Sequence, residues 1–135
     1  MSSLRPTAGG TFANAESTPE PAPGLDIPHL SAQTFGDLAL QHEILTLFID
    51  QTAEILAALA DPAALPSRHA DLLHKLIGSA RAIGAFELVA AAETADLALR
   101  AGHPPSRALQ TLPAAADRAL VAARDYLAIV PRHGD

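Results

Sequence analysis

The sequence predicts an all-α protein, because its composition, apolar spacing and helix-breaking residues all favour that fold class. Hydrophobic residues make up 49% of the 135 residues, with alanine and leucine the commonest, whereas aromatic residues are only 4% and tryptophan is absent. Alanine and leucine are strong helix formers, while β-sheets are enriched in aromatic and β-branched residues. A chain of this size can bury a single core, so we expect one folded unit.

The first 24 residues differ in composition from the remainder of the chain. They are rich in Ser, Thr, Pro and Gly and lack apolar periodicity, which predicts a disordered leader. A proline-rich docking segment is the alternative, but no clear P-x-x-P pattern with flanking basic residues is present. We therefore divide the chain into a leader (1–24), a helical domain (25–131) and a short tail (132–135).

A short helical turn is predicted at residues 31–35, and a long helix follows it. Asp37 is a typical N-cap, because its carboxylate can accept hydrogen bonds from amide groups of the first turn. Over residues 38–60, apolar side chains recur at spacings of three and four, which predicts one amphipathic helix. Asp61 and Pro62 end it.

Three further helices are predicted between breaks rich in proline and glycine. Ser67 can cap a helix over residues 67–84. The next helix, over residues 85–101, is expected to carry Phe86 inward together with smaller apolar residues. The last, over residues 106–130, has an apolar seam despite a proline in an early turn.

Four amphipathic helices joined by short links predict an up-and-down antiparallel four-helix bundle. The short additional N-terminal helix would cover one end of this bundle. Because the four helices fill a core within one chain, we expect a monomer.

Charge and composition exclude several classes of function. The formal net charge is −6 and only nine residues are basic, so we expect no nucleic-acid or membrane partner. The chain has no cysteine and therefore no disulfide or thiolate chemistry. Neither a targeting signal nor a stretch of about 18 apolar residues is present, which favours a soluble, cytoplasmic protein.

The most informative residue is His74, in the middle of the second long helix. At 100° per residue, His74 lies opposite an apolar face, so its imidazole is expected to be exposed. The apolar face comprises Leu72, Leu73, Leu76, Ala80 and Ile83. Gly78 follows His74 by one turn, although glycine costs about 1 kcal/mol relative to alanine inside a helix. We infer that Gly78 leaves room beside His74.

His74 has two alternative interpretations. An ordinary surface histidine explains its exposure but not the glycine. A metal site is disfavoured, because no second histidine lies three or four residues from His74 and no HExxH motif occurs. We therefore expect no metal and no cofactor in this chain.

These residues resemble the histidine-containing phosphotransfer (HPt) domains of phosphorelays, whose active helix carries a histidine, a glycine four residues later and then a small residue. Here these are His74, Gly78 and Ser79. The likeness continues through Ile83-Gly84-Ala85, Leu88, Ala92 and Glu93, and it covers roughly residues 27–130. The resemblance implies a four-helix bundle with a short leading helix.

One position departs from the family pattern. Family members commonly have a lysine three residues after the histidine, where this chain has Ile77. The only lysine, Lys75, points about 100° away from His74. Arg81, two turns beyond His74 on the same face, is therefore the expected substitute, since its guanidinium can donate to phosphoryl oxygens.

The resemblance implies that His74 accepts a phosphoryl group from a receiver-domain aspartyl phosphate and passes it to another receiver. These receivers belong to response regulators or hybrid histidine kinases and would bring the Mg²⁺. The chain would then be a phosphoryl carrier rather than a true enzyme. It has no P-loop or other glycine-rich nucleotide motif, so ATP-dependent kinase activity is not expected.

The partner-binding rim is expected to include Ala70, Asp71, Ile77 and Phe86, although each apolar member could equally be core edge. Asp71 is also expected to pair with Lys75 four residues later. The competing hypothesis is a non-catalytic helical-bundle module that binds and regulates a receiver or kinase without being phosphorylated. The isoleucine at position 77 is its best support.

Overall fold

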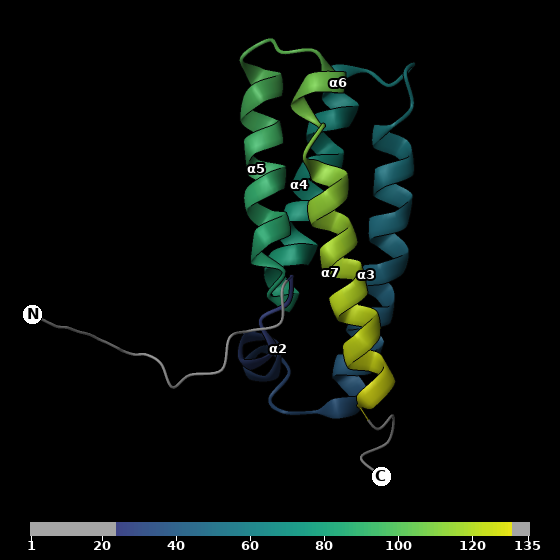
Figure 1. Cartoon of the computed structure of the whole chain (residues 1–135), viewed down its shortest axis with the longest axis vertical. Coiled ribbons are helices and arrows are strands. Elements are labelled where there is room, and N and C mark those ends of the chain that lie inside the picture. Colours follow the sequence, from purple (N-terminus) through teal and green to yellow (C-terminus); the bar gives the residue numbers. More distant parts are fainter. Residues whose placement is uncertain (1–23, 131–135) are drawn as a thin grey trace, which may run out of the picture.

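A computed structural model describes residues 24–130 and confirms the all-α fold class. In this range the chain forms six helices and no strand (Figure 1). None of the six is both long enough and apolar enough to cross a membrane. The predicted tail, and all of the predicted leader except Gly24, lie outside the described residues. The helices are α2 (Ile27–Gln33), α3 (Leu38–Leu59), α4 (Pro66–Ile83), α5 (Phe86–Arg100), α6 (Pro105–Ala108) and α7 (Leu112–Ile129).

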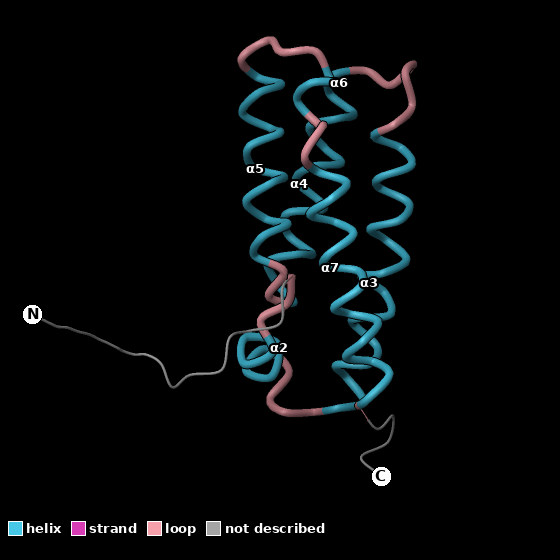
Figure 2. Tube along the Cα trace, in the orientation of Figure 1, coloured by secondary structure: helices cyan, strands magenta, loops and turns pink. Residues whose placement is uncertain are grey.

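The four long helices lie side by side (Figure 2). Helix α4 packs against α3 and α5, and α7 packs against the same two helices, so each long helix has two neighbours. The core lies between them and is filled mainly by leucine and alanine, which lets the helices pack closely. Its largest fully buried side chains are Phe48, Leu45, Leu73, Leu76, Leu88 and Leu112, and Leu30 of α2 joins the same core.

Helix α4 has the orientation that its apolar spacing predicts. All five residues assigned to its inner face are buried, namely Leu72, Leu73, Leu76, Ala80 and Ile83. His74 lies on the opposite, exposed face. The prediction that His74 is exposed on a helix held by its neighbours is therefore confirmed.

Helix α2 is anchored to the C-terminal end of α4. It spans Ile27–Gln33 rather than the predicted 31–35, because Asp26 caps it by accepting from the His29 amide at 3.0 Å. The Asp26 amide donates to the Gly84 carbonyl at 2.9 Å. Gly84 has a φ of +88°, and a Cβ there would lie 2.8 Å from the Asp26 oxygen. Only glycine fits where α4 ends against α2.

Two predicted helix boundaries were wrong. Helix α4 begins at Pro66 with Leu65 as the N-cap, so Ser67 lies within its first turn and caps nothing. The predicted last helix is divided into α6 and α7. Pro113 explains the break, since proline donates no hydrogen bond and its ring clashes with the carbonyl four residues earlier. Proline is accepted in the first turn of α7, so the helix starts again at Leu112.

Candidate functional site

The site is centred on His74, whose side chain is 56% exposed on the outer face of α4. Two residues of α5 approach its ring. A terminal guanidinium nitrogen of Arg100 donates to His74 Nε2 at 3.3 Å. The Asp96 carboxylate oxygen Oδ2 lies 3.7 Å from the same nitrogen, with its side chain only 13% exposed. The imidazole is thus flanked by one positive and one negative group.

Arg100 holds these three groups together. It lies four residues after Asp96 on α5, and its Nε forms an ion pair with Asp96 Oδ2 at 3.1 Å. A guanidinium can only donate, so its contact with His74 is a hydrogen bond when Nε2 carries a lone pair, whereas a proton on Nε2 would face the Asp96 carboxylate. Nucleophilic attack through Nε2 requires the form with the lone pair.

Gly78 leaves open space one turn beyond His74. A Cβ built at Gly78 would meet no atom of a neighbouring element within 4 Å. Packing among the described residues 24–130 therefore does not require glycine here, in contrast to Gly84. Glycine weakens a helix interior, so Gly78 is not there to stabilise α4.

The two basic residues proposed from the sequence lie elsewhere. Arg81 is on the same face as His74, but its guanidinium donates to Glu93 of α5 at 2.9 Å. Lys75 lines a small cavity at the α3 side of α4, together with Gln51 and Glu54. In the described part of the chain, neither basic side chain forms a hydrogen bond or ion pair with the His74 ring. The positive group beside the imidazole is Arg100.

Sequence reasoning missed Arg100 and Asp96, although a signal was present. Helices α4 and α5 are joined by a short turn at residues 84–85. Residues at similar distances from this turn come side by side, which brings 96 and 100 opposite 74. The acidic and basic residues spaced four apart on α5 were therefore detectable once α4 and α5 were paired.

The residues proposed for a partner-binding rim differ in how far they are exposed. Ala70 and Ile77 are partly buried, and Ile77 packs against the core. Asp71 is exposed and, within residues 24–130, forms no ion pair with Lys75.

Phe86 is 42% exposed rather than facing inward. It lies about 15 Å from Asp96 along the axis of α5. Its ring packs edge-on against His29 of α2, with centroids 4.9 Å apart. Phe86 therefore packs where α2 meets the start of α5, away from His74, Asp96 and Arg100.

Searches for a known relative give no further guide to this site. No family model, curated protein sequence or solved structure matches the chain. Within residues 24–130, no group of three or more His, Asp or Glu side chains is placed to hold a metal ion.

Proposed function

We propose that this chain is a histidine phosphotransfer protein of a two-component phosphorelay. Its four long helices would form an up-and-down antiparallel four-helix bundle, with α2 across one end. The observation that carries the proposal is the exposed imidazole of His74, whose Nε2 lies 3.3 Å from a guanidinium nitrogen of Arg100 and one turn from the open space at Gly78. The resemblance of the His74 region to HPt domains supports the same function.

The proposed step is an in-line transfer from a receiver aspartyl phosphate. The lone pair of His74 Nε2 forms an N–P bond while the P–O bond to the aspartate breaks, and that bonding pair leaves on the receiver carboxylate. Such transfers depend mainly on alignment and on neutralisation of the phosphoryl charge. The terminal guanidinium nitrogen of Arg100 would move from His74 Nε2 to the phosphoryl oxygens. The ion pair between Arg100 Nε and the Asp96 carboxylate would hold the rest of the guanidinium in place. The receiver would supply the Mg²⁺.

The approach of a receiver is favoured by the shape of this face. The space beside Gly78 lets the partner come close to His74, which reacting atoms about 3–3.5 Å apart require. A second receiver would take the phosphoryl group by the reverse of the same step. The chain is then a carrier that acts as a monomer in the cytoplasm.

The test is phosphoryl transfer to the full chain from a panel of receiver domains kept phosphorylated with labelled phosphate and Mg²⁺. We expect label on wild type that is acid-labile and alkali-stable, as for phosphohistidine. His74→Gln should take up no label. His103→Gln, which removes another exposed histidine, should be labelled like wild type. Wild type without label from any receiver would refute the proposal.

One observation favours the alternative of a binding module that is never phosphorylated. The Asp96 carboxylate, 3.7 Å from Nε2, would repel the phosphoryl charge. The variant Asp96→Asn separates the two functions. If the chain is a carrier, the equilibrium ratio of phosphorylated to unphosphorylated chain should be about fivefold higher in this variant than in wild type. The reason is that removing the repulsion between the carboxylate and the phosphoryl group at this distance stabilises the phosphorylated form by about 1 kcal/mol. A binding module should bind receivers and remain unlabelled in both forms.

A further inference from the structure

A cavity of about 540 Å³ lies between the first turns of α4 and the segment that follows α5. Asp96 and Arg100, the two residues of α5 that approach His74, form part of its wall. The rest of the wall is mostly apolar. Its apolar residues are Ala64, Pro66, Ala70, Leu99, Pro104 and Pro105. The cavity is therefore an apolar extension of the site around His74.

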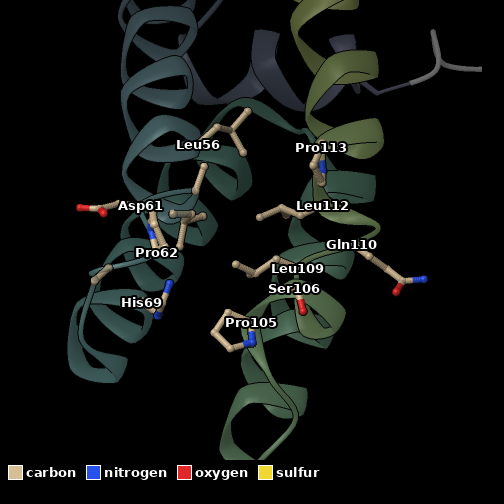
Figure 3. Close-up of a pocket in the computed structure, with 13 residues that line it drawn as sticks. Leu56, Asp61, Pro62, His69, Pro105, Ser106, Leu109, Gln110, Leu112 and Pro113 are labelled. Carbon is tan, nitrogen blue, oxygen red and sulfur yellow. The ribbon is translucent and has the colours of Figure 1, made fainter.

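A larger cavity, of about 610 Å³, lies where α3 ends and α7 begins. Figure 3 shows His69 and Pro105, which line both spaces and so form the boundary between them. Among the described residues 24–130, the lining of the larger cavity includes neither Asp96 nor Arg100. Of these two cavities, only the smaller one adjoins the proposed phosphoacceptor.

The wall contributed by the segment after α5 is held in place by backbone contacts. Helix α5 ends at Arg100, and the His103 amide donates to the Ala98 carbonyl at 3.0 Å. Two successive prolines follow at 104 and 105, and each proline ring fixes its own φ. A preformed apolar cavity can be filled at a low cost in ordering. The space is therefore suited to receive a group from outside.

A partner that reaches His74 must also cover this cavity. Ala70, on its wall, precedes His74 by one turn, or about 6 Å along the axis of α4. A stable interface buries about 800 Å² on each partner, which corresponds to a disc of about 16 Å radius. A receiver domain centred on His74 would therefore extend over the cavity on one side and over Gly78 on the other.

We propose that this cavity takes one or two large apolar side chains of the receiver domain, and that it thereby selects receivers that carry such side chains beside their phosphorylated aspartate. The inference rests on the proposed function. Asp96 and Arg100 form an ion pair with each other at 3.1 Å, so neither is a free partner for a charged side chain that enters. A charge buried without a partner is costly, whereas an apolar side chain that fills a pocket near the centre of an interface often dominates binding.

The first test is the binding of purified, unphosphorylated receiver domains to the full chain. The variant Ser67→Trp places a large side chain at the cavity and leaves the three residues around the imidazole intact. We expect the dissociation constant to rise about tenfold or more, as for loss of an anchoring contact. The rate of phosphoryl transfer at saturating receiver should be unchanged. Because Ser67 is exposed, the variant should unfold at the wild-type temperature.

The control variant is Ala114→Trp, which adds the same side chain at an exposed position of α7, across the molecule from α4. It should bind receivers like wild type. A double-mutant cycle then identifies the side chain that enters the cavity. Exposed apolar residues around the receiver aspartate are replaced by alanine one at a time. We expect one or two of these changes to weaken binding to wild type about tenfold and to have little further effect on Ser67→Trp.

The outcomes separate this inference from the proposed function. Wild-type affinity in Ser67→Trp, or receiver substitutions that cost the same in both forms, would overturn the inference while His74 is still phosphorylated. A chain that shows the expected binding pattern but takes up no label would refute the phosphotransfer function alone. If no receiver binds the wild-type chain, both are wrong.

Discussion

At the scale of single residues, two arginines lie near His74 and only one of them contacts its imidazole. Arg81 shares the outer face of α4 with His74 but is paired with Glu93, while Arg100 reaches Nε2 from α5. The two arginines are similarly exposed and equally charged. They differ in contact with the imidazole, which makes them a matched pair for experiment.

Arg100→Gln should slow phosphoryl transfer to His74 by about tenfold or more, because it removes the donor to the phosphoryl oxygens. The loss should be below the about 10²–10³-fold typical of a buried donor, since the Arg100 side chain is 63% exposed. Single-turnover transfer from a phosphorylated receiver measures this rate. Arg81→Gln, with the same change of charge, should transfer at close to the wild-type rate; the opposite ranking would show that Arg81 is the stabilising group.

The residues of one helix could be predicted more fully than the contacts between helices. The period of apolar residues placed His74 outside and Leu72, Leu73 and Leu76 inside, because these positions depend only on the turn of one helix. The partner of His74 depends on how α5 lies against α4, which the sequence states only indirectly. Arg81 was therefore expected from its own helix, and Arg100 came from the neighbouring one.

At the scale of elements, α4 is held at its C-terminal end by α2, and its two glycines have opposite roles. Gly84 ends the helix in a left-handed conformation, close to Asp26. The His29 ring adds a hydrogen bond by donating from Nε2 to the Arg81 carbonyl at 3.0 Å. Gly78 contributes no such contact and lies in open space.

The same substitution at these two glycines should change stability in opposite directions. Gly78→Ala should raise the free energy of unfolding by about 1 kcal/mol, the difference in helix propensity. Gly84→Ala should lower it by about 1–2 kcal/mol for the left-handed backbone alone, and further through the contact with Asp26. Denaturant unfolding of both variants measures this. A change of the same sign in both would contradict the assigned roles.

A hydrogen-bond chain joins α7, α3 and the end of α2. Tyr126 Oη donates to Gln41 Oε1 at 2.6 Å, and Gln41 Nε2 donates to Thr34 Oγ1 at 3.0 Å. Gln41 and Thr34 are both buried. Burial also raises the pKa of the Tyr126 phenol above its ordinary value, because desolvation disfavours the charged form.

Tyr126→Phe should lower the free energy of unfolding by about 1–3 kcal/mol near neutral pH, because the buried Gln41 oxygen loses its donor. The raised pKa of Tyr126 means that the unfolded chain releases the phenolic proton first. The advantage of wild type is therefore complete below about pH 10 and is lost as pH rises through the folded pKa. Denaturant unfolding of both proteins from pH 7 upward measures it; a constant difference would contradict a buried phenol.

At the scale of the whole molecule, α4 connects the end covered by α2 with the end that holds His69. Its C-terminal end is held by α2, its middle carries His74, and its first turns form the wall shared by two cavities at His69. The four long helices bury their apolar faces against one another within one chain. The face of α4 that bears His74 is exposed.

This arrangement predicts that the full chain is a monomer of 14.0 kDa. Sedimentation velocity over a range of concentrations should give a single species of that mass. A tight dimer would contradict this prediction. It would show that the packing of α3, α4, α5 and α7 within one chain is completed by helices of a second copy.

The most direct test of the central claim is to locate the phosphoryl group by mass spectrometry at neutral pH, after incubation with phosphorylated receivers. We predict a single phosphoryl group on His74, with His42 and His103 unmodified although they lie in the same helical domain. A phosphoryl group on another residue, or wild type that stays unmodified while binding the receiver, would contradict the assignment of His74 as the phosphoacceptor.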